Sequence, residues 1–329
     1  MRLLVTGGAG FIGSTFVRRV LLGAEPTLAG AQVVVLDKLT YAGNEANLAP
    51  VAANPALRFV QGDITDAGLV TGLMAGVDAV VHFAAESHVD RSILGADPFV
   101  LTNVVGTQIL LQAALEAEVP KFVHISTDEV YGSIESGSWP EDHPLEPNSP
   151  YSASKAGSDL LARSYARTYG MDVRITRCSN NYGPYQYPEK VIPLFVTNLL
   201  DGLTVPLYGD GLNVRDWLHV DDHCRAIALV LDRGSAGEIY NIGGGTELTN
   251  TELTSRLLDA LGLDWSRVRP VADRKAHDRR YSVDWTKIRT RLGYTPQVDF
   301  VQGLADTVRW YAERRDWWEP LKAATAVPA

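Results

Sequence analysis

Short apolar runs alternate with amphipathic stretches through the first half of the chain. Buried strands are predicted at residues 2–5, 32–36, 58–61, 79–83 and 122–126. Between them the apolar positions recur at helical spacing, as in residues 14–22. Strands joined through helices require right-handed crossovers, and the resulting parallel sheet binds ligands at the carboxyl ends of its strands. The pattern therefore predicts an α/β fold with a Rossmann-type, doubly wound parallel sheet.

After about Gly183 the pattern breaks into shorter pieces punctuated by Pro and Gly. Helices are predicted there at residues 190–200, 222–231, 251–261 and 301–314, with a frayed end at 323–329. We expect a first domain at residues 1–183 and a smaller mixed α/β C-terminal lobe at 184–329. Strand-like runs at 173–177 and 238–242 are expected to return to the main sheet, the latter from a segment near 211–246, so the boundary is interleaved.

Composition narrows the class of protein. The 329 residues are 46% hydrophobic and 21% charged, which is enough to bury a substantial core. A net charge of -9 argues against a nucleic-acid partner. Two distant cysteines, Cys178 and Cys224, indicate neither a disulfide framework nor a thiolate metal site, and favour a cytoplasmic setting. We expect no signal peptide, no stretch of membrane-spanning length and no membrane partner.

A glycine turn follows the first predicted strand directly. Gly7, Gly10 and Gly13 enclose Phe11 and Ile12 and lead into a predicted helix. Glycines in a strand-turn-helix context let backbone amides approach a pyrophosphate at the helix N-terminus. The turn therefore predicts a dinucleotide site in the first domain.

An acidic residue, Asp37, ends the second predicted strand. A carboxylate there can accept hydrogen bonds from both ribose hydroxyls and repel a 2'-phosphate, which indicates NAD rather than NADP. The neighbouring Lys38 could partly neutralise that repulsion. Asp63 and Ile64 follow the third strand, where such folds commonly hold the adenine.

Tyr151 and Lys155 are spaced so that both project from one face of a predicted helix. A nearby ammonium and a cationic nicotinamide would favour the phenolate of Tyr151, which could then take a proton from a hydroxyl as hydride leaves the same carbon. Thr127, Asp128 and Glu129 stand at the end of the fifth strand. Both carboxyl groups can face a substrate only if the chain is already leaving the sheet at that point.

These motifs resemble the extended short-chain dehydrogenase/reductase family, and within it the dehydratases that act on dTDP-glucose. The resemblance covers nearly the whole chain and rests on residues 6–13, 82–90, 126–132, 151–155 and 177–184, followed by 189–193. It implies that Tyr151 is the base on the C4 hydroxyl, that Lys155 lowers its pKa and holds the nicotinamide ribose, and that Thr127 orients the hydroxyl. Glu129 would remove the C5 proton and Asp128 would protonate the departing C6 hydroxyl.

The resemblance also implies the remaining ligands. NAD, tightly bound and regenerated in each turnover, would contact Leu39, Thr40, Phe83, Ala84, Ala85, Ser87, Thr102 and Asn181 besides the residues above. The nucleotide sugar would contact Ser87, Thr127, Asn180, Lys190, Val191, Pro206, Leu207, Tyr208, Arg215, Asn250, Arg274, His277 and Tyr281. A homodimer is expected through helices at residues 99–116 and 151–169, although burial within one subunit explains the same apolar pattern.

Several alternatives stay open at this point. A 4-epimerase or decarboxylase acting on a UDP-sugar would keep Tyr151 and Lys155 without needing Asp128 and Glu129, and a non-catalytic NAD-sensing protein would usually lose Tyr151 and Lys155. Neither the choice of dTDP over UDP, nor the pathway that the product enters, nor which carboxyl holds the proton follows from the sequence. The pair His219 and His223 invites a metal hypothesis, which we reject because His219 is expected outside the helix. Trp310, Trp317 and Trp318 are expected to be packing residues.

Overall fold

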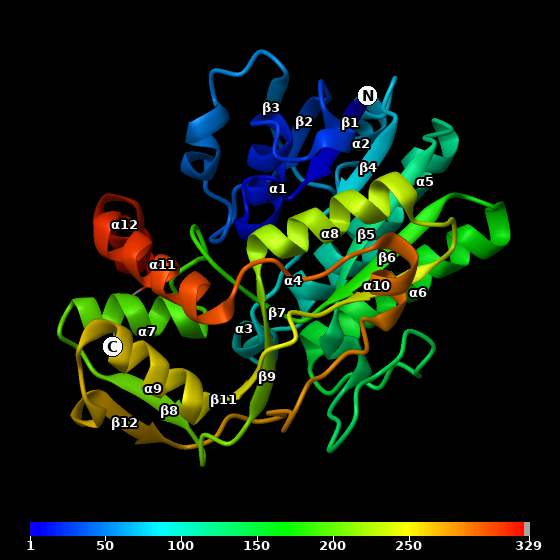
Figure 1. The fold of residues 1–329 in the computed structure, drawn as a ribbon. Coiled ribbons are helices and arrows are strands. Elements are labelled where there is room, and N and C mark those ends of the chain that lie inside the picture. The colour runs from blue at the N-terminus through cyan, green and yellow to red at the C-terminus, as the bar shows by residue number, and fades with distance from the viewer. Residues whose placement is uncertain (326–329) are drawn as a thin grey trace.

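The computed structural model describes residues 1–325, and within them seven parallel strands form the main sheet (Figure 1). Their order is β10-β6-β5-β4-β1-β2-β3. The bounds are Arg2–Thr6 (β1), Gln32–Asp37 (β2), Leu57–Gln61 (β3), Ala79–His82 (β4), Lys121–Thr127 (β5), Val173–Cys178 (β6) and Ile239–Ile242 (β10). The strand order reverses between β1 and β4, and ligands bind at such a switch point. The predicted Rossmann-type sheet is confirmed, including the return of β10 beside β6.

Helices cover both faces of this sheet. On one face α1 (Phe11–Leu21) packs beside α8 (Val220–Arg233), and on the other α2 (Ala67–Leu73), α5 (Thr107–Glu116) and α6 (Pro150–Tyr169) lie next to one another. The alternation along β1 explains the two layers, because Leu3 and Val5 join the core under α1 while Leu4 joins the core under α5.

One helical stretch differs from expectation. Residues 97–116 form a continuous helix made of α4 (Asp97–Phe99), a π-helical stretch at Val100–Gly106, and α5. It is the one helix among residues 1–325 that is long and apolar enough to cross a membrane, so the expectation that no stretch reaches that length is wrong. In the fold this helix packs against α2 and α6, and 44% of its apolar window is buried.

The smaller lobe is built around α7 (Val191–Leu200), α9 (Asn250–Leu261) and α11 (Phe300–Glu313). A parallel pair, β8 (Val205–Tyr208) and β12 (Val268–Val271), covers one side (Figure 1). A three-stranded sheet of β11 (Glu247–Thr249), β9 (Val214–His219) and β7 (Asn180–Tyr182) connects the lobe with the main sheet. The remaining helices are η1 (Pro26–Leu28), η2 (Glu45–Val51), α3 (Val89–Leu94), η4 (Asp128–Tyr131), η5 (Trp265–Arg267), α10 (Thr286–Leu292) and α12 (Arg315–Thr325).

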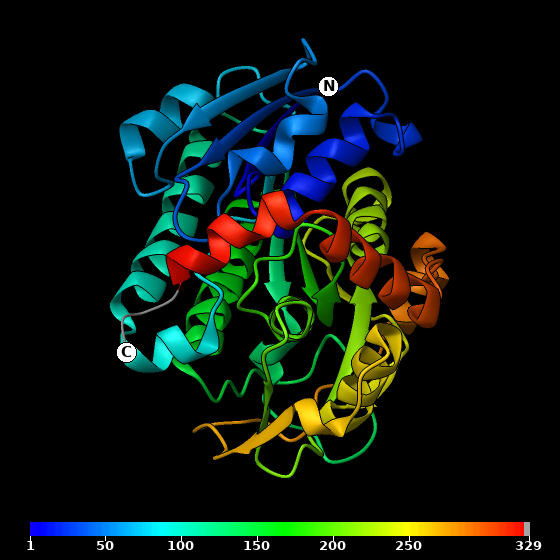
Figure 2. The same cartoon turned by 90° about the vertical axis from the view of Figure 1, so that its left-hand side faces the viewer.

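The C-terminal helices α11 and α12 cross the junction between the two parts, as Figure 2 shows in red. Trp317 and Trp318 are buried and Trp310 packs against them, which confirms their predicted packing role. Residues 323–325 belong to α12, so the predicted frayed end is wrong for them, and 326–329 lie outside the described residues. The boundary at residue 183 stays a prediction.

Candidate active site

A deep cavity opens at the carboxyl ends of the main-sheet strands. It is lined by all predicted cofactor residues except Leu39, namely Gly7, Gly10, Phe11, Ile12, Gly13, Asp37, Lys38, Thr40, Asp63, Ile64, Phe83, Ala84, Ala85, Ser87, Thr102, Tyr151, Lys155 and Asn181. The predicted catalytic and substrate residues Thr127, Asp128, Glu129, Asn180 and Lys190 line the same cavity. One continuous space therefore joins the glycine turn to the carboxyl pair.

The glycine turn is shaped for close approach of a ligand. Gly7 has φ +68, and a Cβ there would lie 2.5 Å from the Ala84 nitrogen. A Cβ on Gly13 would lie 2.3 Å from the Gly7 carbonyl oxygen, so a side chain at this position would clash with the turn. Helix α1 begins at Phe11, three residues earlier than predicted. The cap residue Gly10 supplies no side-chain cap, which leaves the first amides of α1 open to a diphosphate.

Asp37 supports this turn as well as facing the cavity. Its carboxylate accepts hydrogen bonds from the amides of Ala9 and Leu39, each at 2.9 Å, and burial raises its pKa. Lys38 pairs with Asp63 at 2.6 Å. The positive charge that could have weakened the preference for NAD is therefore held by another carboxylate.

Tyr151 and Lys155 lie in the first turns of α6, which begins with a capping box between Ser149 and Ser152. The Lys155 ammonium donates to the carbonyl of Ile125 at 2.7 Å, and burial lowers its pKa to about 8. Burial and the charge of Glu129 raise the pKa of Tyr151 well above its ordinary value. The protein alone therefore does not provide the lowered phenol pKa expected from the sequence, because these two effects outweigh the side-chain hydrogen bond with Thr127.

The carboxyl pair sits where the chain leaves the sheet. Strand β5 ends at Thr127, whose hydroxyl caps the short helix η4 by accepting from the Glu129 amide at 3.2 Å. The geometric condition set by the sequence is therefore met, because Asp128 and Glu129 already belong to a helical turn. Asp128 is only 2% exposed, and burial together with the charge of Glu129 raises its pKa well above the ordinary range.

Glu129 has different surroundings. Burial raises its pKa too, but the positive charges of Lys190, Arg274 and Arg215 oppose that effect. Lys190 is anchored by donating to the Ser87 carbonyl at 2.7 Å. The two neighbouring carboxyl groups therefore differ in the protonation state that their surroundings favour, and the proton is favoured on Asp128.

Other predicted substrate residues lie in the smaller lobe, outside the cavity lining. Arg215 stacks on the ring of Tyr281 at 4.2 Å. The rings of Tyr208 and His277 meet edge to face at 6.4 Å. Val191 and Asn250 begin α7 and α9, and Pro206 and Leu207 belong to β8.

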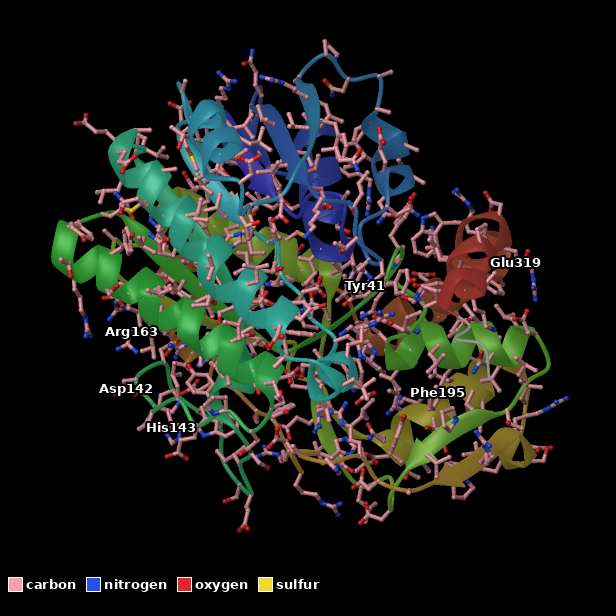
Figure 3. All side chains as sticks on the ribbon, turned by 180° about the vertical axis from the view of Figure 1, so that it is seen from behind. Tyr41, Asp142, His143, Arg163, Phe195 and Glu319 are labelled. Carbon is pink, nitrogen blue, oxygen red and sulfur yellow. The ribbon has the colours of Figure 1, made fainter. Side chains whose placement is uncertain are left out.

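The sequence missed several lining residues, namely Leu36, Ala42, Gly43, Glu86, Ile125, Ser126, Cys178, Ser179, Gln186, Tyr187 and Glu189. Several of these sit at strand ends, a signal that could have found them. Tyr187 packs edge to face on Tyr41 at 5.7 Å, and Arg91 lies 4.0 Å over the Tyr41 ring. Figure 3 shows Tyr41 between the main sheet and the lobe that carries Phe195. These contacts depend on segments far apart in the sequence.

His219, just before α8, and His223, within it, have separate partners. His219 caps the helix by accepting from the Asp221 amide at 3.2 Å, outside the helical face as expected. His223 bonds through Nδ1 to Asn181 Oδ1 at 2.9 Å, and burial lowers its pKa to about 3. Because His223 stays neutral, it can orient Asn181 at the cavity wall.

Comparison with known proteins agrees with this geometry. The family described as GDP-mannose 4,6 dehydratase matches residues 4–307. A dTDP-glucose 4,6-dehydratase of Streptomyces antibioticus is 64% identical, covering 100% of this chain and 98% of the relative. A crystal structure of a dTDP-glucose 4,6-dehydratase double mutant from Streptomyces venezuelae with NAD bound is 72% identical, covers 98% of this chain and 100% of that one, and has a TM-score of 0.97.

A more distant relative shares the fold. The UDP-glucose 4-epimerase of Thermotoga maritima is 32% identical, covers 95% of this chain and 99% of that one, and has a TM-score of 0.87. The family match spans most of the chain, and the similar dehydratase structure aligns from end to end. The chain therefore belongs to the GDP-mannose 4,6-dehydratase family, the nucleotide-sugar dehydratases of the extended short-chain dehydrogenase/reductase type.

Proposed function

We propose that this enzyme is an NAD-dependent hydro-lyase that converts dTDP-glucose to dTDP-4-keto-6-deoxyglucose and water. The observation that carries the proposal is the Asp128–Glu129 turn, which opens into the same cavity as Tyr151 and Lys155. The 64% identity to a dTDP-glucose 4,6-dehydratase supports the choice of substrate. Such a product feeds deoxysugar biosynthesis.

The cavity fits NAD at each of its parts. A Cβ at Gly7 or Gly13 would occupy the space at the turn, which glycine leaves free for the cofactor. The open amides of α1 suit a diphosphate, and Asp37 suits an unphosphorylated ribose. When bound, NAD supplies a hydride acceptor at the start of the cycle and a hydride donor at its end, so it is regenerated within one turnover.

The oxidation step belongs to α6. Tyr151 takes the proton of the C4 hydroxyl, which Thr127 orients, while Lys155 holds the nicotinamide ribose and supplies positive charge. Since the protein by itself raises the pKa of Tyr151, the positive charge of the oxidised cofactor is needed to favour the phenolate. Proton removal by Tyr151 therefore depends on bound NAD.

The elimination step belongs to η4. The new C4 ketone acidifies the C5 proton, which Glu129 removes, and Asp128 donates a proton to the departing C6 hydroxyl. The raised pKa of Asp128 favours its protonated form, and the cations around Glu129 favour the ionised form of that residue. The pair can therefore act as acid and base at once.

The smaller lobe supplies the nucleotide site. Lys190, Arg215 and Arg274 place positive charge beside the carboxyl pair, which suits the diphosphate of the sugar nucleotide. Around them we assign Ser87, Asn180, Val191, Pro206, Leu207, Tyr208, Asn250, His277 and Tyr281 to sugar and base contacts. A 4-epimerase of the same family has no use for an acid and a base at this turn, so we set that alternative second.

Product analysis tests the assignment. Purified enzyme is incubated with dTDP-glucose, and the expected product is the dehydrated 4-keto-6-deoxy sugar nucleotide, identified by mass and proton spectrum. A galacto-configured sugar or unchanged substrate would contradict it. UDP-glucose, run in parallel, measures the selectivity for the base.

We also propose that the active form is a homodimer in the cytoplasm. Val100, Leu101 and Val105 on the long helix and Leu160 on α6 are 49%, 50%, 39% and 52% exposed, an apolar face that suits a second copy. Both cysteines are free and buried, which suits a reducing compartment. Leu101→Glu with Leu160→Glu is expected to give a monomer by light scattering, and an unchanged dimer would contradict this interface.

A further inference from the structure

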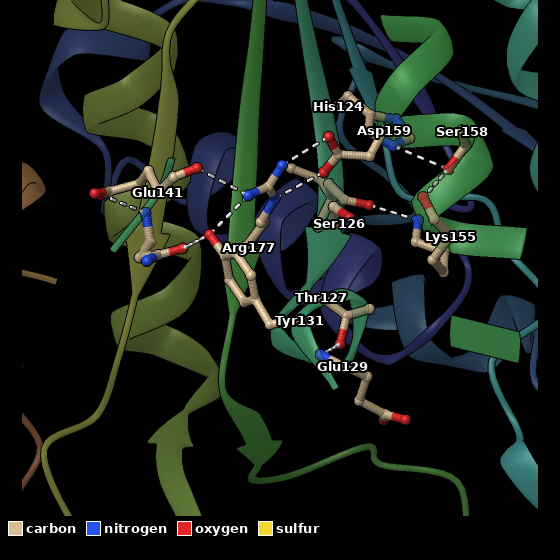
Figure 4. A network of polar contacts seen from close by, with 12 residues as sticks. His124, Ser126, Thr127, Glu129, Tyr131, Glu141, Lys155, Ser158, Asp159 and Arg177 are labelled. Atoms are coloured by element: carbon tan, nitrogen blue, oxygen red, sulfur yellow. Dashed lines mark hydrogen bonds and ion pairs between the residues drawn. The ribbon is translucent and has the colours of Figure 1, made fainter. Parts of the chain in front are cut away.

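A buried ion pair lies behind the active site. Arg177 on β6 and Asp159 on α6 are both fully buried, and the guanidinium donates to the two carboxyl oxygens at 2.8 and 2.9 Å (Figure 4). Asp159 stands one helical turn beyond Lys155, and its charge opposes the lowering of the Lys155 pKa by burial. The pair thus fixes β6 to the helix that carries the redox residues.

The Arg177 guanidinium also contacts η4, the turn that carries the proposed elimination residues. Its remaining terminal nitrogen donates to the Tyr131 hydroxyl at 2.7 Å and to the Glu141 carbonyl at 3.1 Å. Tyr131 is the last residue of η4, the turn that presents Asp128 and Glu129. Its hydroxyl donates in turn to Asn241 on β10 at 2.9 Å.

We propose that Tyr131, Arg177 and Asp159 are positioning residues that hold the carboxyl turn η4 in register with the Tyr151–Lys155 helix. This inference rests on the proposed function, because only a dehydratase needs both groups to act on one bound sugar. None of the three residues lines the cavity, so they act through the groups that they hold.

Stability alone does not account for this arrangement. Removing two charges from water is costly, and an apolar pair of similar volume often serves a fold as well. The planar guanidinium instead joins three chain segments with fixed directions, which a flexible ammonium would not do. A misplacement of about 1 Å in catalytic geometry can lower a rate by about 100-fold, so such fixing has a functional value.

Tyr131→Phe is the direct test. It removes the hydroxyl that joins Arg177 to η4, while the ring can keep its stacked contact with Trp139 at 5.5 Å and the Arg177–Asp159 pair is untouched. We expect kcat for dehydration to fall about tenfold with an unchanged KM, and reduced nicotinamide to accumulate because oxidation outruns elimination. Tyr294→Phe is the matched control, since that buried hydroxyl donates to the Gly243 carbonyl away from the cavity lining.

Equal kcat values for Tyr131→Phe and wild type, or equal losses in Tyr131→Phe and Tyr294→Phe, would overturn the inference. If Tyr131→Phe folds poorly, the double variant Arg177→Met with Asp159→Leu decides the question. It is expected to keep the thermal midpoint within a few degrees and still lose about tenfold in kcat; full activity in that variant would overturn the inference. A wild-type enzyme that forms no dehydrated sugar would instead contradict the proposed function itself.

Discussion

The Thr127 hydroxyl donates to one carboxyl oxygen of Asp128 at 3.2 Å, and the other carboxyl oxygen is buried without a hydrogen-bond partner in the described structure. An ionised carboxylate would be poorly solvated there, whereas a neutral carboxylic acid needs much less solvation. Because the pKa of Asp128 is raised in the folded protein, folding favours its protonated form. Burial and the charge of Glu129, which outweigh the hydrogen bond from Thr127, are the basis for assigning Asp128 as the acid.

Asp128→Asn should therefore keep the fold and lose the acid. We expect dehydration to fall about 100-fold, as for loss of a general acid. In wild type the raised pKa means that stability falls as pH rises above the ordinary carboxyl pKa, and the amide lacks this penalty. The thermal midpoint of the variant should exceed that of wild type by more at about pH 8 than at about pH 5. A gap that shrinks with rising pH would contradict a protonated Asp128.

Glu129→Gln should separate oxidation from elimination. The variant retains Tyr151 and Lys155, so mixing with dTDP-glucose should still produce the absorbance of reduced nicotinamide. Dehydration should fall about 100-fold or more because the C5 proton has no base. Tyr151→Phe is the matched comparison, in which the reduced cofactor should not form. Dehydration by Glu129→Gln at the wild-type rate would disprove the base assignment.

Deprotonation of Lys155 should change activity and stability in opposite directions as pH rises. Its pKa of about 8 means that the charge is lost as pH rises through that value, and we expect kcat to fall on the alkaline side. Between about 8 and the ordinary lysine pKa of 10.5 the unfolded state binds more protons at this group, so its contribution to stability rises with pH. A kcat that declines while the thermal midpoint does not would agree with this assignment. A flat kcat up to about pH 10 would contradict it.

The C-terminal helix is linked to the dinucleotide turn through one residue. Trp317 on α12 donates to the Asn47 side chain at 2.9 Å, and Asn47 donates to the Ala9 carbonyl within the glycine turn at 2.8 Å. Loss of one such hydrogen bond costs about 1 kcal/mol. Trp317→Phe should therefore speed NAD dissociation by up to about fivefold, measured by release of prebound NAD. Trp265→Phe, at a 45% exposed position, is the control and should not change that rate.

Much of the fold could be predicted because its strands are apolar runs separated by helices. The strands at residues 32–36 and 122–126 were placed within a residue at each end. The strands β7, β8, β9, β11 and β12 were missed, and all of them except β9 have only three or four residues, which carry little periodic signal. α12 was also missed, because Pro320 lies inside it.

The candidate site could likewise be predicted only in part. The residues of local motifs, such as Gly7, Tyr151 and Glu129, lie together around one cavity. The network of Tyr131, Arg177 and Asp159 joins three separate elements, and no local spacing marks it. The raised pKa of Asp128 could not be predicted from the sequence either, because it depends on burial that only the fold creates.

Transfer of hydrogen within one sugar tests the central claim most directly. The enzyme is given dTDP-glucose that carries deuterium at C4, and the product is examined by proton and deuterium spectra. Oxidation at C4, elimination across C5 and C6 and return of the same hydride predict deuterium in the C6 methyl group of a 4-keto product. Deuterium retained at C4, or a product that still carries the C6 hydroxyl, would contradict a 4,6-dehydratase.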